Sequence, residues 1–326
     1  MKILSIFNNK GGVGKTTYLF HIAHLAASRG RSVLMVDCDS QCNLTAYTLN
    51  DKAIEKAWEE KNGNSIYRAI ELVARGIGDV RDRAPSKIRE NLSLIPGDLF
   101  LSNFEDKLGD SWNSARGGSE PSLRVQSAIY RSILNAADKA NAELVLVDLG
   151  PNLGALNRAV LGGSDYIIIP VSPDLFSIRG TENLGSKLVT WSEEWSQANA
   201  AWKGSGFEIP KGKPKFAGYV IQHHNIRDNA EGMTQGWQIF GNRLDSAITT
   251  NIVDKLTPIG QVHPIKGSDY NLGKIPNLHS LIPYSLAARK PVYECTGADG
   301  LKGAHITRAR DSKTHFNPIV DLIVSL

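Results

Sequence analysis

The stretch Lys2-Ile-Leu-Ser-Ile-Phe-Asn-Asn-Lys10-Gly-Gly-Val-Gly-Lys15-Thr16-Thr17 lies near the start of the chain. Its apolar first part predicts a buried strand, its glycines predict a turn, and the apolar spacing over 18–29 predicts a helix. A glycine turn between a strand and a helix is typical of a phosphate-binding loop, because glycines let backbone N–H groups approach an anion closely. The helix N-terminus adds partial positive charge at the same place. We therefore expect this stretch to bind the phosphates of a nucleotide.

The same loop carries the side chains that a nucleoside triphosphate requires. Lys15 is expected to reach the β- and γ-phosphates, and the Thr16 hydroxyl is expected to bind Mg²⁺. The standard pattern G-x-x-x-x-G-K-[ST] is met at Gly14, Lys15 and Thr16, whereas Asn9 holds the first glycine position and Lys10 is an additional lysine. The alternative is a glycine-rich turn without a ligand, which the strand–turn–helix setting disfavours. The expected nucleotide-binding residues are Lys10, Gly11, Gly12, Val13, Gly14, Lys15, Thr16 and Thr17.

Three aspartates follow two further apolar segments. Asp37 and Asp39 come after the strand expected at 33–36, and Asp148 ends the strand expected at 143–147. In a parallel α/β sheet, ligands bind at the carboxyl ends of the strands, so these side chains should lie near the phosphate loop. An aspartate that ends such a strand holds Mg²⁺, usually through water, which makes Asp148 a candidate metal ligand. The alternative for Asp37 and Asp39 is a pair of loop carboxylates that cap a turn.

These segments together resemble the ParA/MinD family of ATPases. Lys-Gly-Gly-Val-Gly-Lys-Thr-Thr at 10–17 resembles the deviant Walker A loop of that family. The segment 37–45 resembles its switch I, and 148–151 resembles its Asp-x-x-Pro segment. The resemblance is poor over 46–90 and over 186–275, where the sequence assigns no role.

The resemblance implies a role for each charged residue of the site. Lys10 would reach the phosphates that a partner subunit binds, Asp39 would position the attacking water, and Asp37 would support the Mg²⁺ site. The implied catalytic residues are Lys10, Lys15 and Asp39, and the implied metal ligands are Thr16, Asp37 and Asp148.

The rest of the chain alternates between helical and strand patterns. This alternation predicts one doubly wound α/β domain over 1–326, a P-loop NTPase fold with a mostly parallel sheet. A loop at 222–229 is expected near the base of the nucleotide. Further helices are expected at 53–60, 65–74, 99–108, 122–140, 181–198, 236–249 and 316–326. Further strands are expected at 91–95, 165–171 and 215–221, with a last strand and turn at 279–285. Connections are expected at 75–89, 109–121, 174–180 and 199–214.

The composition is ordinary for a cytoplasmic globular protein. Hydrophobic residues make up 41% of the 326 residues, and no apolar run approaches the roughly 18–20 residues that span a bilayer. The cysteines Cys38, Cys42 and Cys295 do not form a disulfide framework, which fits a reducing compartment. Because the loop follows the first seven residues directly, we expect neither a signal peptide nor a preceding helix-turn-helix, as in the short ParA type.

The resemblance further implies a switch that uses ATP and Mg²⁺. ATP would close a face-to-face homodimer, and the dimer would bind duplex DNA of the nucleoid without sequence preference. A ParB-like or other activating partner would trigger slow hydrolysis, and the cargo would be a plasmid or chromosome partition complex. Between 289 and 313 there are six basic residues against three acidic ones, which favours DNA contacts there. Interspersed surface charges would give the same count. The candidate DNA contacts are Arg289, Lys290, Lys302, Arg308, Arg310 and Lys313.

Two other functions are compatible with the same nucleotide site. A regulatory ATPase of this fold, from a mobile-element or defence operon, would act on a different partner. A MinD-like ATPase that cycles on a membrane would need a basic amphipathic helix at its C-terminal end. Residues 318–326 hold one acid and no Lys or Arg, which fits a buried helix, so we expect no membrane partner.

Overall fold

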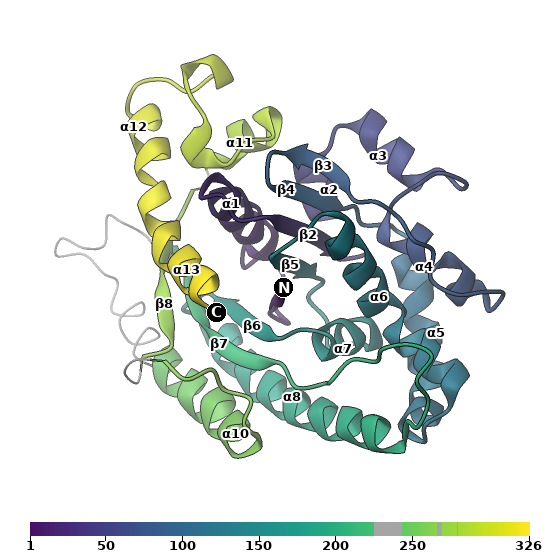
Figure 1. The fold of residues 1–326 in the computed structure, drawn as a ribbon. Helices are drawn as coiled ribbons and strands as arrows, with labels where there is room; N and C mark the ends of the chain where they lie inside the picture. Colours follow the sequence, from purple (N-terminus) through teal and green to yellow (C-terminus); the bar gives the residue numbers. More distant parts are fainter. Residues whose placement is uncertain (225–242, 266–268, 279) are drawn as a thin grey trace.

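The computed structural model describes residues 1–224, 243–265, 269–278 and 280–326. Within these residues, eight strands form one sheet in the order β3-β4-β2-β5-β1-β6-β7-β8 (Figure 1). Neighbouring strands are parallel except β3 and β4, which pair antiparallel at one edge. The prediction of a doubly wound, mostly parallel α/β sheet is therefore confirmed. The strands are β1 (Lys2–Ile6), β2 (Val33–Cys38), β3 (Ser86–Arg89), β4 (Leu92–Ile95), β5 (Leu144–Leu149), β6 (Tyr166–Val171), β7 (Lys215–His224) and β8 (Asn271–Pro276).

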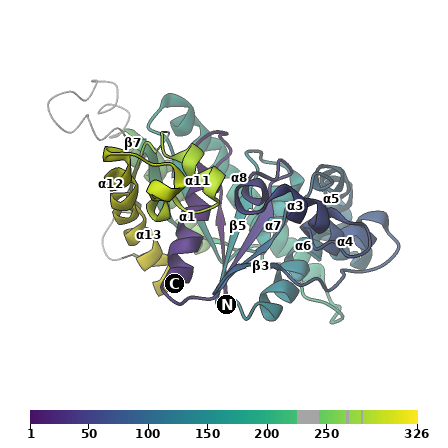
Figure 2. The same ribbon diagram turned by 90° about the horizontal axis from the view of Figure 1, so that it is seen from above.

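Helices cover both faces of the sheet. They are α1 (Lys15–Ser28), α2 (Asn43–Thr48), α3 (Asp51–Trp58), α4 (Ile66–Arg75), α5 (Leu101–Arg116), α6 (Glu120–Lys139), α7 (Ala155–Gly162), α8 (Leu175–Ala201), α10 (Asp254–Leu256), α11 (Ile282–Ala288), α12 (Ala304–Asp311) and α13 (Lys313–Ser325). Short π and 3₁₀ turns are η2 (Thr249–Val253), η3 (Thr257–Ile259), η4 (Val292–Glu294) and η5 (Gly297–Asp299). Figure 2 shows α1, α12 and α13 on one side of the strands and α4, α5 and α6 on the other.

The side chains of each strand alternate between the two faces of the sheet, so each strand packs against helices on both sides. On β2, Leu34 and Val36 pack in the apolar cluster that contains α4 to α8. Val33 and Met35, on the same strand, pack in the cluster that contains α1 and α13. Both faces are therefore buried, which is why the central strands are mostly apolar.

The predicted flexible connection over 109–121 is wrong. Helix α5 continues to Arg116, and α6 begins four residues later, at Glu120. Trp112 is buried, stacks edge-on against Trp195 at 4.9 Å between ring centroids, and donates a hydrogen bond from Nε1 to Glu194 at 2.9 Å. Burial of this aromatic pair outweighs the weak helix propensity of Gly109.

The predicted last strand over 279–285 is also wrong. The last strand is β8, and α11 begins at Ile282 instead. Pro283 lies in the first turn of α11, where its missing N–H would have no helical partner in any case. Ser285 on α11 is buried and bonded to the Tyr47 hydroxyl at 2.8 Å, which holds the helix against α2. Residue 279 itself lies outside the described residues.

Other boundaries also differ from the prediction. The loop expected at 75–89 ends in the edge strand β3, and α7 has no counterpart in the prediction. Helix α8 begins at Leu175, inside the expected connection, because the Asp174 carboxylate caps it by accepting from the Ser177 N–H at 2.9 Å. Of the helix expected at 236–249, residues 243–248 are helical and 236–242 lie outside the described residues. Of the loop expected at 222–229, the first three residues belong to β7, and residues 225–229 lie outside the described residues.

Candidate functional site

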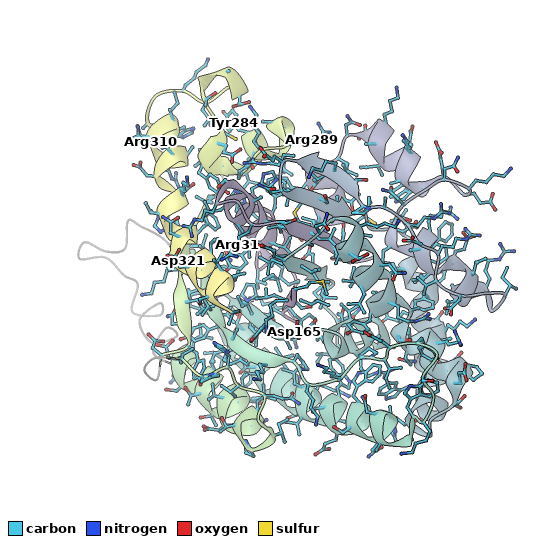
Figure 3. All side chains as sticks on the ribbon, in the orientation of Figure 1. Arg31, Asp165, Tyr284, Arg289, Arg310 and Asp321 are labelled. Atoms are coloured by element: carbon cyan, nitrogen blue, oxygen red, sulfur yellow. The ribbon has the colours of Figure 1, made fainter. Side chains whose placement is uncertain are left out.

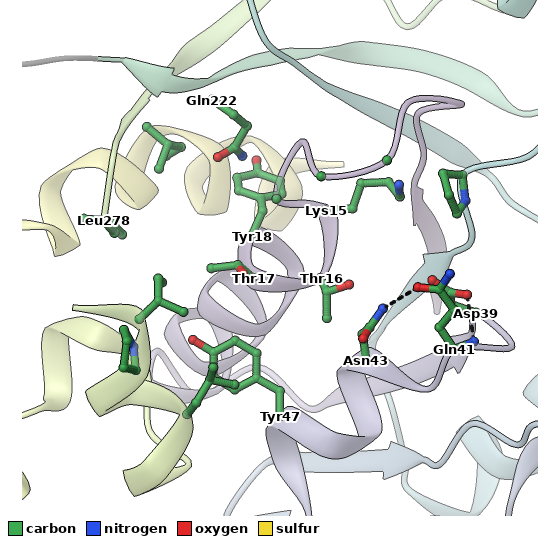
Figure 4. Close-up of a pocket in the computed structure, with 18 of the residues that line it drawn as sticks. Lys15, Thr16, Thr17, Tyr18, Asp39, Gln41, Asn43, Tyr47, Gln222 and Leu278 are labelled. Carbon is green, nitrogen blue, oxygen red and sulfur yellow. Dashed lines mark hydrogen bonds between the residues drawn. The ribbon is translucent and has the colours of Figure 1, made fainter. Parts of the chain in front are cut away.

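The phosphate loop joins the carboxyl end of β1 to the first residue of α1. Gly12 and Gly14 adopt positive φ angles of 73° and 77°, which residues with a side chain rarely adopt. The loop lines one end of a cavity of about 620 Å³ (Figure 4). Asp39 lines the same cavity, so the loop and the end of β2 meet as the sequence predicts. The loop residues that line it are Gly11, Gly12, Gly14, Lys15, Thr16 and Thr17.

The Lys15 side chain lies in the cavity and is almost fully buried. Its Nζ donates a hydrogen bond to the Lys10 carbonyl oxygen at 3.3 Å. Burial lowers the pKa of this ammonium, and the negative charges of Asp148 and Asp39 act in the opposite direction. A buried cation of this kind gains strongly from an anionic ligand, because charge-assisted hydrogen bonds are the strong ones.

Asp148 lies directly beside Thr16. The Thr16 hydroxyl donates to Asp148 Oδ2 at 2.7 Å. The other oxygen, Oδ1, is buried and has no hydrogen-bond partner among the described residues. Burial raises the pKa of this carboxyl to about 8, and the charge of Asp37 adds to the rise. An acidic oxygen buried without a partner, beside a threonine hydroxyl, is a donor set that suits a hard cation such as Mg²⁺.

A cation at Asp148 would not be enclosed by protein ligands alone. Among the described residues, no group of three or more His, Cys, Asp or Glu side chains is arranged to hold a metal ion. Mg²⁺ usually keeps several waters and takes its remaining ligands from one or two carboxylates and the phosphates of a substrate. The residues present therefore fit a magnesium ion that arrives together with a nucleotide.

Asp37 is fully buried, and both of its oxygens accept hydrogen bonds. Oδ2 accepts from the N–H and the hydroxyl of Thr45 at 2.8 and 2.7 Å, and Oδ1 accepts from the Asp39 N–H at 3.2 Å. Burial raises its pKa to about 6. These bonds fix the start of α2 and the backbone of Asp39, so Asp37 organises this side of the site. Gly97 matters here too, since a Cβ at this position would lie 2.8 Å from the Asp37 carboxyl carbon.

Lys10 lies at the rim of the site rather than among the residues that line the cavity. Its Nζ forms an ion pair with Asp174, the residue that caps α8. Both side chains are about one-third exposed, at 31% and 34%. The sequence predicts Lys10 as a functional residue but gives no signal for Asp174, because the pair joins residues that are 164 positions apart.

The other end of the cavity is apolar and, apart from Tyr47 of α2, comes from the C-terminal part of the chain. The sequence does not predict these residues as parts of the site, because its pattern predicts neither β8 nor α11. Two residues of β7 and α1, Gln222 and Tyr18, lie where the two ends meet. The apolar lining consists of Tyr47, Ile275, Pro276, Leu278, Ile282, Pro283, Leu286 and Phe316.

The six basic residues predicted to contact DNA are all exposed and lie at the end of α11, on α12 and in the adjoining segments. Figure 3 shows Arg289 and Arg310 at the same end of the molecule. Lys290 pairs with Asp299 at 2.9 Å, and Arg310 contacts the neighbouring Asp311 at 3.3 Å. Arg308 donates to the carbonyl oxygen of Asn277 at 2.7 Å. Half of the predicted DNA contacts are therefore already engaged within the chain.

Comparison with known proteins places these features in a family. A family model described as an AAA domain matches residues 1–199. The sporulation initiation inhibitor protein Soj of Bacillus subtilis is 30% identical over 183 residues, which cover 56% of this chain and 63% of Soj. The chromosome partitioning protein ParA of Caulobacter vibrioides is 27% identical over 186 residues, with 56% and 61% covered. The matched stretch thus spans less than two thirds of each relative.

A solved structure shows the same fold along the whole chain. It is that of a Borrelia burgdorferi protein named as a plasmid partition protein, with AMPPNP bound. It has a TM-score of 0.58 and 19% identity, and the match covers 99% of this chain and 98% of that one. Within the described residues, no helix is both long and apolar enough to span a membrane.

Proposed function

Because the chain belongs to the ParA/MinD superfamily of ATPases, we propose that it is an ATP-dependent switch of plasmid or chromosome partition. In this proposal Mg²⁺ and ATP bind in the cavity, two subunits dimerise, and the dimer binds nucleoid DNA without sequence preference. A ParB-like or other activating partner then triggers hydrolysis. The observation that carries the proposal is the buried Asp148 Oδ1, which has no hydrogen-bond partner among the described residues. This carboxylate lies beside Thr16, at the end of a glycine loop that is open to a cavity.

Phosphoryl transfer requires mainly positioning and charge stabilisation, and the residues present supply both. The loop N–H groups and Lys15 would hold the phosphates, while Thr16 and Asp148 would hold the magnesium ion. Mg²⁺, when bound, neutralises negative charge on the phosphates. Asp39 would orient the attacking water, because its carboxylate lines the cavity and its backbone is fixed by Asp37.

Dimerisation follows in this proposal from the position of Lys10. At the rim of the site, its ammonium is close to solvent and is held by one carboxylate, Asp174. An exposed ion pair of this kind is weak. A triphosphate bound by a second subunit would offer Lys10 several negative charges instead of one. Lys10 would then act like an arginine finger supplied in trans, which stabilises the charge on the phosphates of another subunit. Lys10 would therefore exchange Asp174 for the partner's phosphates.

DNA binding tests this function, and the structure suggests which residues to change. Lys302 and Lys313 are exposed, and among the described residues no carboxylate pairs with either. Changing both to alanine should weaken binding to any duplex. The matched control changes Lys52 and Lys56, two exposed lysines of α3. Figure 1 places α3 far from α12, so the control should bind DNA normally.

The measurement is fluorescence anisotropy on random duplexes across a range of salt, with ATP, with ADP and without nucleotide. If each subunit neutralises about two phosphates, the logarithm of affinity should fall with the logarithm of salt at a slope of about −3 to −4. Changing Lys302 and Lys313 should reduce that slope, and binding should require ATP. Binding that is absent at low salt with ATP, or that is the same with ATP and ADP, contradicts the partition function. It would instead favour an ATPase of the same fold that acts on another partner.

A further inference from the structure

Three lysines lie close together in the sequence where the connection from α8 enters β7. Lys211, Lys213 and Lys215 are exposed, whereas the residues between them, Gly212 and Pro214, are buried. The three side chains therefore lie on the solvent side of one segment, and we call them the lysine row. Among the described residues, no carboxylate forms an ion pair with any of the three.

The backbone that carries the lysine row is fixed by its neighbours. The Gly212 N–H donates to the Gly162 carbonyl oxygen at 2.9 Å. The Lys215 N–H donates to the Asp165 carbonyl oxygen at 2.8 Å. Gly212 has a φ of 69°, and a Cβ there would lie only 2.0 Å from the Cβ of Trp195, so the chain packs directly against this residue. Because the segment is already ordered, a ligand of the lysine row has little backbone entropy to overcome.

Further positive charge lies beside the lysine row at the amino end of the sheet. Lys215 is opposite Tyr166 where β7 pairs with β6, and the Lys2 Nζ lies 5.7 Å from the centre of the Tyr166 ring. The His263 ring packs edge-on against Tyr166 at 5.4 Å between centroids. Burial lowers the pKa of His263, and the positive charges of Lys215 and Lys2 lower it further. This end of the sheet therefore carries a continuous positive field.

Two carboxylates of the adjoining segments reduce this charge without cancelling it. Asp165 accepts the Ile3 N–H with Oδ2 at 2.8 Å, and Glu208 is an exposed residue of the same connection. The lysine row, Lys2 and Lys203 are five exposed lysines against these two acids. Lysine binds phosphate groups as a point charge, so an excess of unpaired lysines suits a ligand with several phosphates.

The lysine row lies at the opposite end of the sheet from the basic residues near α12. Lys215 is the first of the ten residues of β7, and at about 3.3 Å per residue the strand separates its two ends by roughly 30 Å. Arg308 of α12 contacts Asn277, just beyond the carboxyl end of β8, which is parallel to β7. Figure 2 shows the N-terminus, where β1 begins, at the end of the strands away from α11 and α12. A duplex bound at α12 would have to bend sharply to reach the lysine row, and bending DNA is costly.

We propose that the lysine row binds the phosphate backbone of a second DNA duplex, so that nucleotide-bound dimers join two DNA segments. This inference rests on the proposed function, in which the C-terminal basic residues hold the first duplex. Lys211 and Lys215 are four residues apart, so their backbones are separated by at most about 14 Å, and one DNA strand carries a phosphate about every 3.4 Å of its axis. Each lysine therefore has a phosphate within reach, whatever the base sequence.

The residues between the lysines fit DNA rather than an acidic polypeptide. Gly212 and Pro214 offer no polar side chain that could recognise the sequence of a partner, whereas the backbone of DNA is uniform. Three lysine contacts bind weakly by themselves, because the affinity for DNA grows with the number of phosphates neutralised. They become effective when several dimers are bound along one duplex and their lysine rows contact the second duplex together. The second contact therefore follows the loading of dimers onto the first duplex.

The test measures the capture of a fluorescent random duplex by another random duplex that is fixed to beads. The whole chain is added with Mg²⁺-AMPPNP, and binding to a single duplex is measured in parallel by fluorescence anisotropy. The unchanged protein should capture the free duplex, and capture should fall steeply as the salt concentration rises. Changing Lys211, Lys213 and Lys215 together to alanine should reduce capture on the order of tenfold and leave the affinity for a single duplex within about twofold.

Two matched variants separate the position of the charge from its amount. Changing the three residues of the lysine row to arginine keeps the charge and should keep the capture. Changing Lys52, Lys56 and Lys61 to alanine removes three exposed lysines on and just after α3, and both measurements should stay unchanged. The melting temperature of each variant should stay close to that of the unchanged protein, because exposed side chains contribute little to stability.

The outcomes distinguish this inference from the proposed function. Binding of a single duplex without capture of a second one by the unchanged protein overturns the inference and leaves the proposed function standing. Capture that is the same in the alanine variant of the lysine row overturns the role of these residues. If the unchanged protein on the beads captures fluorescent poly-glutamate but no duplex, the surface binds acidic polypeptides and the assignment to DNA is overturned. Absence of single-duplex binding overturns the proposed function and the joining of two duplexes together.

Discussion

Replacing Asp148 by asparagine should stabilise the metal-free protein at neutral pH while it abolishes Mg²⁺-dependent nucleotide binding. Burial raises the pKa of this carboxyl from 3.8 to about 8. At pH 7 the unfolded chain is ionised at Asp148 and the folded chain is protonated. Holding that proton costs the folded state up to about 4 kcal/mol, at 1.36 kcal/mol for each pKa unit between 3.8 and 7. Asparagine has the same shape, still accepts from Thr16, and requires no proton.

The sign of the effect gives its pH dependence. Because the folded pKa lies above the unfolded one, the stability of the unchanged protein relative to Asp148→Asn falls as pH rises from 3.8 to about 8. At pH 7 the free energy of unfolding of the variant should therefore exceed that of the unchanged protein by about 2–4 kcal/mol. The lower figure applies because the charges of the neighbouring Asp37 and Lys15 partly adjust to that of Asp148. The gain should be close to zero at pH 3.5, where both states are protonated.

Urea unfolding with EDTA, at several pH values between 3.5 and 8, measures this gain. Asp110→Asn on the exposed surface of α5 is the matched control and should change stability little at any pH. A variant that is no more stable than the unchanged protein at pH 7, or that is equally stabilised at pH 3.5, would refute the reasoning. Calorimetry with Mg²⁺-AMPPNP should show that the stabilised variant no longer binds tightly.

Two further predictions concern α1. Lys15→Ala should raise the Kd for Mg²⁺-AMPPNP on the order of a hundredfold, because several charge-assisted hydrogen bonds disappear together; wild-type affinity by calorimetry would exclude this lysine from the phosphate site. His21 accepts the Val292 N–H at 2.9 Å, and burial lowers its pKa to about 4. As the pH falls, the imidazole is protonated at a higher pH in the unfolded chain than in the folded one. The free energy of unfolding should therefore fall by about 2 kcal/mol from pH 7 to pH 5 through this residue. In urea titrations, His21→Gln should reduce the number of protons taken up on unfolding in this range by about one.

The phosphate-loop half of the cavity could be predicted because its signals are local. Gly12, Gly14, Lys15 and Thr16 are consecutive or nearly so, and their spacing alone requires a strand, a turn and a helix start. The position of the Asp148 carboxylate can also be predicted from a local pattern, because an apolar strand that ends in Asp brings this side chain to the ligand-binding edge of a parallel sheet.

The other half depends on contacts between distant segments, which a single sequence does not reveal. Gln222 becomes a site residue only because β7 brings it against Gly14, more than 200 positions away. The sequence pattern predicts the end of a strand at Pro283, although this residue lies in the first turn of α11, because a short apolar run fits either structure. Asp174 belongs to the site because it forms an ion pair with Lys10, and Trp112 extends α5 because it packs against Trp195. In each case, tertiary packing decides between local alternatives.

The central claim is that ATP causes two subunits to form a dimer, and the mass of the protein in solution tests this claim most directly. Asp39→Ala should bind ATP but not hydrolyse it, so it holds the triphosphate state during the measurement. With Mg²⁺-ATP, multi-angle light scattering should give this variant twice the 35.6 kDa of one chain, and with ADP a single chain. Adding Lys10→Ala should restore the single-chain mass with ATP. A mass of one chain for Asp39→Ala under saturating Mg²⁺-ATP, or a dimer that is indifferent to both nucleotide and Lys10, would contradict the account.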